Sequence, residues 1–399
     1  MIRCIKCEQV DMIMKAGFVR GKQRYLCKEC NFYFTLPTPT LPSAIHPKRR
    51  RHQTTIIDIA RTLGVSNSTV SRALHGHPDI SPETRQLVLD TATQLDYQPN
   101  QLAYSLVKSL TNTIGIIVPE FFTPFFPNVI VGVQEVLSQA GYHLIIMQSS
   151  ESYDTEVGNT KAMLANRVDG VIASLSLQTN NYEHFKALEK RGIPIVFFNR
   201  VCQELNGPKV VVNDFGGAFK AVEHLIQNGY RRIAHLGGPP NLVISQERLR
   251  GYTSALQKHG FDIHPELIIH SDLTAQKARI YGQYLLDMET PPDAIFAVND
   301  PTAIEILILA KSRGLRVPED LGVVGFSDDP IAAHIGNGLT TVRQPTHLMG
   351  KITAEMILKL INEEEEQWVP EAKVLETELI IRGSSVRESY DAVFNEANR

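Results

Sequence analysis

Hydrophobic residues follow different patterns along the chain, and one of these patterns covers most of it. From Thr113 onward, short continuous apolar runs alternate with longer amphipathic stretches. Buried parallel strands are continuous apolar runs, and their regular alternation with helices is typical of doubly wound parallel sheets covered by helices. The runs are TIGIIVP, YHLIIMQS, DGVIASL, IPIVFFN, KVVVND, RRIAHLG, ELIIHS, DAIFAVND and LGVVGFSDD. Because about ten strand-helix units exceed one ordinary sheet, the pattern predicts two α/β lobes.

Residues 54–98 instead show the spacing of three short helices. TTIIDIARTLGV begins at a threonine cap, places Ile57, Ala60 and Leu63 three residues apart, and ends at Gly64. SNSTVSRALHG and SPETRQLVLDTATQLDY each begin at a serine cap. The apolar residues of these two helices are Val70, Ala73 and Leu74, then Leu87, Val88 and Leu95. Two short helices joined by a GVS turn and followed by a third form a helix-turn-helix pattern.

Small polar residues open the second of these helices. Ser66, Asn67, Ser68 and Thr69 stand at its start, and Arg72 follows one turn later. In helix-turn-helix proteins these positions face base edges in the major groove, and the free N–H groups of a helix N-terminus can bind phosphate. The pattern favours DNA binding over the alternative of a small helical bundle with a polar surface.

Four of the five cysteines form two pairs near the start of the chain, spaced Cys4-x2-Cys7-x19-Cys27-x2-Cys30. This spacing is close to that of a four-thiolate zinc site, in which each CxxC pair presents two sulfurs from a tight turn. No fifth ligand or open position is evident, so the pattern favours structural Zn²⁺ over catalysis. Rubredoxin-like iron and reactive thiols are the alternatives. Cys202 stands alone, as a buried or idle thiol.

Composition adds an asymmetry of charge. The 399-residue chain carries a formal net charge of −3. Residues 1–110 hold 15 Lys and Arg against 8 Asp and Glu, whereas the remainder holds 25 against 35, so nucleic acid would bind at the front. No apolar run approaches the roughly 20 residues that span a bilayer, and the first residues lack the apolar core of a secretory signal. We therefore expect a cytoplasmic protein, in which paired cysteines more often hold metal than form disulfides.

Polar residues recur where the predicted strands of the two lobes end. They are Asn199, Arg200, Asn213, Asp214, Asn299, Asp300, Ser327, Asp328 and Asp329. In doubly wound sheets, ligands bind outside the carboxyl ends of the strands. Carboxylates and guanidinium groups beside an apolar cleft suit a polyhydroxylated ligand. Any single one of these residues is more often a helix N-cap, but their recurrence at one end of the sheets favours a site.

The head segment TTIIDIARTLGVSNSTVSRALHGHPDISPETRQLVLDTATQLDYQPNQLAYSL closely resembles that of LacI-family transcriptional regulators, and the resemblance continues through TNTIGIIVPE to RGSS near Ser385. It implies a homodimer whose heads read a pseudo-palindromic operator, and a two-lobed periplasmic-binding-protein-like core with parallel sheets. The contacts it implies are base edges for Asn67 and Ser68, base or backbone for Arg72, and phosphates for Thr69 and Ser71.

PNQLAYSLVKS matches the hinge helix of the same family. In that family a leucine from each subunit wedges into a minor-groove base step and kinks the duplex. The matching residue here is Leu106, with Ala103 in the same hinge. A plain core leucine is the alternative for Leu106.

The resemblance also selects effector-binding residues. SQERLRGY matches the segment with a ligand-gripping arginine, and its register favours Arg248 over Arg250. AVNDPTA matches the segment whose aspartate binds sugar hydroxyls, here Asp300. FFTPFFPNVIVG matches the loop that lines the cleft, where Phe125 and Phe126 stack on the ligand or belong to the lobe core. Asn199 and Asp328 complete the predicted effector site.

The family's topology implies that the chain crosses between lobes near residues 212–214, 342–344 and 377–379. A ligand that bridges the lobes changes their relative angle, orders or melts the hinge helices, and so changes operator affinity. The resemblance does not indicate which sugar or sugar derivative is bound, or whether it releases or promotes DNA binding.

GFVRGKQRYLCKECNFYFT resembles the zinc ribbon of some transposase-associated proteins. That resemblance implies nucleic-acid contact through Arg20, Lys22, Arg24 and Lys28. LacI-family chains usually start at the first helix of the head, so this segment departs from the family pattern. It would extend the operator contact, form a protein interface, or stabilise the N-terminus.

The sequence thus predicts a multidomain protein with no enzymatic motif, since paired catalytic carboxylates, a nucleophile elbow and a phosphate loop are all missing. The alternatives are a sugar-binding protein and a transposase-related DNA-binding protein without effector control. The predicted parts are a zinc ribbon (1–35), a Pro-rich basic linker (36–53), an all-α helix-turn-helix head (54–99), a hinge helix and linker (100–112), the two-lobed α/β effector-binding and dimerisation domain (113–385) and a tail (386–399).

Overall fold

The computed structural model describes residues 2–8, 10–19, 22–35, 54–98, 110–205, 207–362 and 372–387. Most of the predicted linker, hinge helix and tail lie outside the described residues, and so do Arg20, Ala103 and Leu106. The chain divides into two units, Met1–Asn100 and Gln101–Arg399.

The N-terminal segment folds as a small antiparallel sheet. Its strands are β1 (Ile13–Val19), β2 (Lys22–Cys27) and β3 (Phe32–Thr35), in that order across the sheet. Cys27 lies opposite both Ile13 and Phe32. The core is minimal, because Cys4, Cys27 and Phe34 are its buried members.

The head contains three helices, α1 (Ile56–Leu63), α2 (Asn67–Leu74) and α3 (Pro82–Gln94), as the spacing predicts. Gly64 ends α1 with a φ of 66°, a conformation that favours glycine. The fully buried residues Ile59, Val70 and Val88 form the centre of the core. Ile57 is 50% exposed and Leu87 is 54% exposed. These two apolar residues therefore face solvent, although they share the helical spacing of the core residues.

The physical reason lies in the helical period. In α1 the face formed by Ile56, Ile59, Ala60 and Leu63 has the i, i+3, i+4, i+7 spacing of a core-facing stripe, and Ile57 falls outside it.

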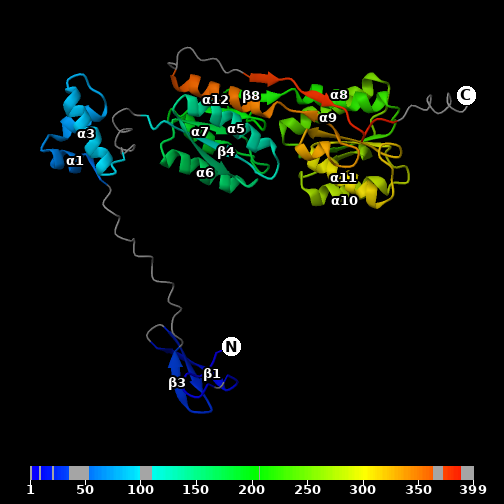
Figure 1. Ribbon diagram of the computed structural model, residues 1–399. Coiled ribbons are helices and arrows are strands. Elements are labelled where there is room, and N and C mark those ends of the chain that lie inside the picture. The colour runs from blue at the N-terminus through cyan, green and yellow to red at the C-terminus, as the bar shows by residue number, and fades with distance from the viewer. Residues whose placement is uncertain are drawn as a thin grey trace, which may run out of the picture. The chain divides into compact units, whose positions relative to one another are not determined.

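The larger unit has two lobes, each built on a six-stranded sheet (Figure 1). In lobe 1 the order is β14-β8-β7-β6-β4-β5, with every pair parallel. In lobe 2 the order is β10-β9-β11-β12-β13-β15, parallel except that β15 is antiparallel to β13. The strands are β4 (Thr113–Val118), β5 (His143–Gln148), β6 (Gly170–Ala173), β7 (Ile195–Phe198), β8 (Lys209–Val212), β9 (Ile233–Gly237), β10 (Ile268–His270), β11 (Ala294–Ala297), β12 (Gly322–Ser327), β13 (Thr340–Arg343), β14 (Ala372–Leu375) and β15 (Glu378–Ile380).

All nine apolar runs form strands, which confirms the predicted α/β lobes. The runs did not include β13, β14 or β15, whose sequences TTVR, AKVL and ELI are short and partly polar. β14 and β15 are edge strands of their sheets, so one side of each lacks the burial that makes a strand continuously apolar.

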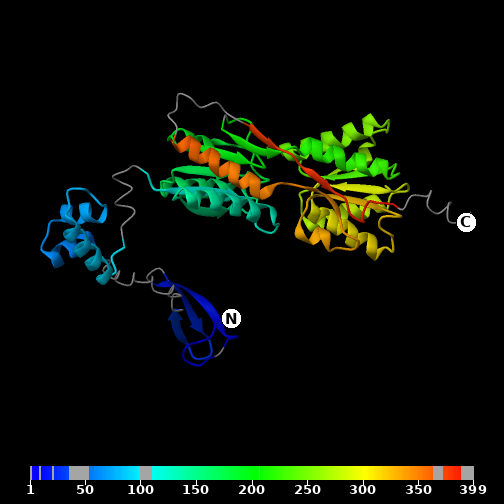
Figure 2. The ribbon, with the colours of Figure 1, turned by 45° about the horizontal axis from the view of Figure 1, so that its top comes forward.

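Helices cover both faces of each sheet. In lobe 1, α5 (Phe125–Gln139) and α12 (Thr346–Asn362) cover one face, and α6 (Tyr153–Ala165) and α7 (Glu183–Glu189) the other. In lobe 2 the corresponding pairs are α8 (Asp214–Gln227) with α9 (Val243–Lys258), and α10 (Ala275–Leu286) with α11 (Asp300–Ser312). Helices α5 and α12 lie side by side in Figure 2. They touch at Gly132 and Gly350, where any Cβ would collide with backbone of the other helix.

The chain passes between the lobes three times (Figures 1 and 2). The passages connect β8 to α8, β13 to α12, and β14 to β15. They fall at residues 213, 344–345 and 376–377, as the resemblance implied. Two 3-10 turns, Pro265–Leu267 and Pro330–Ala333, complete the fold. Within the described ranges, no helix has the length and apolar character needed to cross a bilayer.

Candidate functional site

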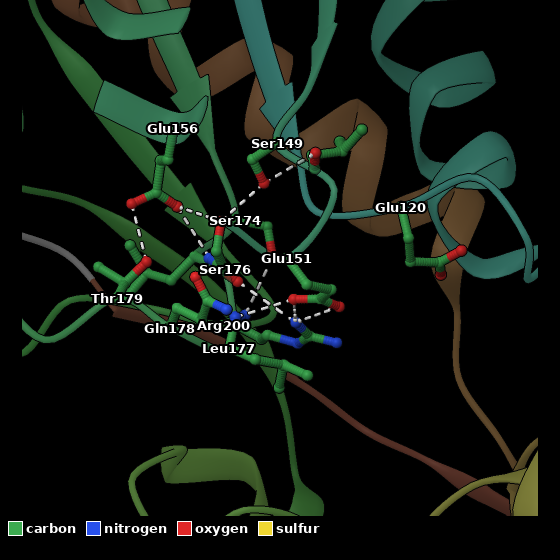
Figure 3. Close-up of polar contacts among 12 residues, drawn as sticks. Glu120, Ser149, Glu151, Glu156, Ser174, Ser176, Leu177, Gln178, Thr179 and Arg200 are labelled. Carbon is green, nitrogen blue, oxygen red and sulfur yellow. Dashed lines mark hydrogen bonds and ion pairs between the residues drawn. The ribbon is translucent and has the colours of Figure 1, made fainter. Parts of the chain in front are cut away.

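The first wall of the candidate site is the carboxyl-end edge of the lobe 1 sheet (Figure 3). Arg200 follows β7, and its Nη1 lies 2.9 and 2.8 Å from the two carboxylate oxygens of Glu151, which follows β5. Glu151 also accepts a hydrogen bond from the backbone N–H of Leu177 at 2.8 Å. Arg200 is 7% exposed. The ion pair therefore fixes the segment after β6 against the end of β7.

A second glutamate holds the same segment through several hydrogen bonds (Figure 3). Glu156, on the first turn of α6, is fully buried. Its carboxylate accepts hydrogen bonds from the N–H and the Oγ–H of Ser176 at 2.8 and 2.9 Å, and from Oγ1 of Thr179 at 2.8 Å. Nε2 of His184 lies 2.9 Å from it. A buried carboxylate is stable only when it is surrounded by such donors.

Replacing Glu156 with glutamine should destabilise lobe 1, because the amide NH2 cannot accept the bonds that the carboxylate accepts. We expect a loss of about 2–3 kcal/mol, or roughly 5–10 °C in the melting temperature. Thermal unfolding by circular dichroism measures it. Glu183→Gln, an exposed glutamate on α7, is the matched control. Equal melting temperatures for the two variants would contradict the role given to Glu156.

The second wall is the facing edge of lobe 2. Arg248 on α9 is 4% exposed, and its Nε and Nη2 lie 2.8 and 2.7 Å from Oδ1 of Asp214, which begins α8. Nη1 donates to the carbonyl of Val298 at 2.5 Å, and the guanidinium lies 3.7 Å from the ring centroid of Phe326. The arginine is thus held in one place by charge, hydrogen bonding and stacking.

Three aspartates crowd the same edge beyond β11 and β12. Asp300 is fully buried and accepts hydrogen bonds from Oγ1 of Thr341 at 2.5 Å and from the N–H of Asp329 at 2.8 Å. Asp328 is paired with Arg343 and Arg382, each at 2.7 Å. Burial raises the pKa of Asp300 to about 6. The pKa of Asp329 is raised to about 7, mainly by burial and further by the negative charges of Asp300, Glu120 and Asp328.

These raised pKa values predict how stability depends on pH. Both groups hold protons in the folded protein at pH values where the unfolded chain, with a pKa near 3.8, has lost them. Their contribution to the free energy of unfolding is therefore lost as the pH rises from about 4 to about 7. We expect Asp329→Asn to raise the melting temperature at pH 8 by roughly 3–8 °C and to change it little at pH 4. Melting curves across that range test this, and an equal effect at both pH values would count against it.

The structure brings several predicted effector residues to this pair of walls. Arg248, the arginine selected from the sequence, points into lobe 2 towards Asp214, whereas Arg250 is exposed. Asn199 is buried, with a φ of 55°, and its N–H donates to the carbonyl of Val210. Phe125 and Phe126 are 7% and 3% exposed and belong to the apolar core beneath α5.

Sequence reasoning missed Glu151, Glu156, Arg343 and Arg382. Glu151 closely follows the run YHLIIMQS, so the strand-end rule that selected the other residues could have found it. Arg382 lies far from Asp328 along the chain, and nothing in the sequence pairs them.

A hydrogen bond connects the two walls: Nδ2 of Asn241 in lobe 2 donates to the carbonyl of Leu177 in lobe 1 at 3.2 Å.

The start of α2 is the candidate DNA-reading surface. Ser66 caps the helix, because its Oγ accepts the N–H of Thr69 at 3.1 Å. Asn67, Ser68 and Arg72 are exposed, and Thr69 and Ser71 are partly exposed. The polar side chains predicted to face DNA are thus accessible, and Ser66 serves first as the cap.

Two neighbouring substitutions should separate stability from DNA reading. Ser66→Ala should lower head stability by about 1 kcal/mol through loss of the cap. Asn67→Ala should leave stability unchanged and weaken specific binding by about 1–3 kcal/mol, with little effect on non-specific binding. Fluorescence anisotropy with operator and random duplexes, together with thermal unfolding, measures both. Uniform weakening on all duplexes by Asn67→Ala would instead indicate a phosphate contact.

A helix-turn-helix head followed by two hinged α/β lobes defines a DNA-binding regulator with a small-molecule-binding domain. A protein-family model described as "Bacterial regulatory proteins, lacI family" matches residues 55–100. A second model, described as "Periplasmic binding protein-like domain", matches residues 222–385. The chain belongs to the lacI family of bacterial regulatory proteins.

Two relatives illustrate the extent of the similarity. The HTH-type transcriptional regulator CelR of Thermobifida fusca is 34% identical over 343 residues, covering 84% of this chain and 99% of CelR. The HTH-type transcriptional repressor CytR of Escherichia coli (strain K12) is 32% identical over 340 residues, covering 85% and 98%. A solved CelR–cellobiose complex has a TM-score of 0.64 at 32% identity, covering 83% of this chain and all of that one.

Proposed function

We propose that this transcriptional regulator is a homodimeric repressor whose operator affinity is controlled by a sugar or sugar derivative bound between the lobes. The observation that carries the proposal is the pair of facing polar walls, centred on Arg200 and Glu151 in lobe 1 and on Arg248 and Asp214 in lobe 2. The complex of its relative CelR with cellobiose supports a sugar as the ligand class.

The ligand would act by changing the angle between the lobes. Three backbone passages connect them, so a ligand that contacts both walls favours one angle over others. Lobe 1 is tied to the chain that leads from the head, because the N–H of Thr111 donates to Asp169 at 2.8 and 3.1 Å. Movement of lobe 1 therefore reaches the hinge segment, where Ala103 and Leu106 are the proposed minor-groove contacts.

The proposal assigns DNA reading to the exposed face of α2. Asn67, Ser68 and Arg72 would contact base edges, and Thr69 and Ser71 phosphates. Two heads are needed to read a pseudo-palindromic site, which is the reason for a homodimer. Exposed apolar residues on lobe 2, Ile308 at 43% and Ile331 at 55%, support a second copy as the partner of that lobe.

We further propose that residues 1–35 form a zinc ribbon, an addition that precedes the matched head. Sγ of Cys4 and Sγ of Cys30 lie 3.6 Å apart, as do those of Cys7 and Cys27 at 3.5 Å. All four sulfurs lie within 4.8 Å of one another. Four thiolates at about 2.3 Å from a tetrahedral Zn²⁺ lie roughly 3.8 Å apart, so the spacing fits the metal with little adjustment.

The small core of the ribbon supports a structural role for the metal. Three buried residues cannot stabilise so short a sheet, and a bound ion would supply the missing free energy. Lys6 lies over the ring of Phe32 and Arg24 over the ring of Tyr33, so basic and aromatic side chains lie together on the ribbon. Lys22, Arg24 and Lys28 remain proposed nucleic-acid contacts, with Arg20.

A gel-shift experiment on DNA upstream of the protein's own gene tests the regulator. We expect the full chain to retain one fragment at nanomolar concentration, with affinity that falls steeply as salt rises. A sugar-binding protein without DNA function would retain none at low salt. A transposase-related DNA-binding protein would retain the fragment but show no response to any sugar.

A further inference from the structure

We infer that the cleft selects an uncharged, polyhydroxylated ligand and rejects the phosphorylated or carboxylated derivatives of the same sugar. The inference rests on the proposed function, because it concerns the ligand of that site. Three observations carry it: the pairing of the cleft's arginines, the surplus of carboxylates, and the kind of polar atom left without a partner.

The arginines of the two walls are already matched by carboxylates. Arg200 is paired with Glu151 at 2.8 Å, and Arg248 with Asp214 at 2.7 Å. Arg343 and Arg382 converge on Asp328. An anionic ligand that drew the guanidinium of Arg200 or Arg248 away from its carboxylate would leave that carboxylate uncompensated.

Carboxylates remain after these pairs are made. Asp300 is fully buried; Oγ1 of Thr341 and the backbone N–H of Asp329 donate to its carboxylate, which forms no ion pair within the part of the chain that the structure describes. Asp329 is 7% exposed, and the charge of Glu120 reaches it from lobe 1. At pH 8, above the raised pKa values of Asp300 and Asp329, these groups are ionised, and a phosphate or carboxylate placed between them would be repelled from both lobes.

The buried polar atoms without a protein partner match hydroxyl groups. At the strand-end edges of the described lobes they include Nε of Arg200, Oγ of Ser245, Oγ of Ser271 and Oε1 of Gln344. The first can only donate, the last can only accept, and the serines can do both. A hydroxyl both donates and accepts, so a polyol can satisfy this mixed set. A phosphate or carboxylate group only accepts, so such a group placed against Oε1 of Gln344 would leave that acceptor unsatisfied.

Matched sugar pairs test the inference with the full chain. The probes are cellobiose, glucose and ribose, each beside a charged counterpart: cellobionate, glucose 6-phosphate and ribose 5-phosphate. Isothermal titration calorimetry and thermal shift should show binding of at least one uncharged sugar, at least tenfold tighter than its charged counterpart. A charged sugar that binds as tightly as its parent, or more tightly, would overturn the inference and leave the proposed function standing. If no sugar of either kind binds, the sugar-effector proposal fails and the inference fails with it.

A variant pair identifies the cause of the discrimination. Asp329→Asn removes one surplus carboxylate and should reduce the preference for the uncharged member of a pair at least threefold. Asp287→Asn, which removes an exposed carboxylate paired with Arg313 on lobe 2, should leave the preference unchanged. An unchanged preference in Asp329→Asn, or an equal reduction in both variants, would overturn the assignment of the preference to carboxylates of the cleft.

Discussion

Replacing Arg248 with alanine should abolish the response to effector and destabilise lobe 2 by about 3–5 kcal/mol. The substitution leaves Asp214 buried at 5% exposure without its partner, and it removes the donor to Val298 and the cation over Phe326. Operator binding itself does not use Arg248. A variant that still folds should therefore bind operator with the same Kd at every sugar concentration. Thermal unfolding and anisotropy with operator measure the two effects.

Arg250→Ala is the matched control on the same helix. Arg250 is exposed and paired with Glu247 three residues earlier, so its loss should cost less than about 1 kcal/mol and leave the effector response intact. If Arg250→Ala abolished the response and Arg248→Ala did not, the register chosen for the ligand-gripping arginine would be wrong.

Replacing Cys27 with serine should remove one metal ion per chain and unfold the ribbon while leaving the two lobes folded. Cys27 is fully buried at the centre of the ribbon core, and its Sγ is one of four that would surround the ion. Zn²⁺ content by mass spectrometry and hydrogen exchange of residues 1–35 measure the effects. We expect about one Zn²⁺ per chain in the natural protein and almost none in the variant.

Cys202→Ser provides the control, because Cys202 is a buried thiol in the lobe 1 core. This variant should keep its metal. Full metal content in Cys27→Ser would exclude the four-thiolate site. Visible absorption and bound iron in the natural protein would assign the site to iron instead of zinc.

Much of the fold could be predicted from the sequence because its elements obey local rules. The nine apolar runs are buried on both faces of a parallel sheet, so burial alone marks them. Ser66 and Ser81 cap helices whose starts are visible in the sequence. Ile57 and Leu87 are apolar yet exposed, because a single apolar residue cannot reveal which helical face meets the core.

The candidate site was predictable only in part, for a different physical reason. Strand-end residues such as Asn199, Asp300 and Asp328 follow from topology, since parallel strands end at one edge. The pairing of Arg382 with Asp328, and the four bonds to Glu156, depend on tertiary packing between distant segments. The sequence pattern does not show which charged side chains pair with one another. The charge balance of the cleft could therefore be read only from the structure.

The most direct test of effector control is a titration of the operator complex with a sugar that binds the full chain. Fluorescence anisotropy with a labelled operator at constant ionic strength would give Kd with and without saturating sugar. The account predicts a change in Kd of at least tenfold, equal to a coupling free energy of about 1.4 kcal/mol or more. A sugar that binds between the lobes by calorimetry yet leaves Kd unchanged would contradict it.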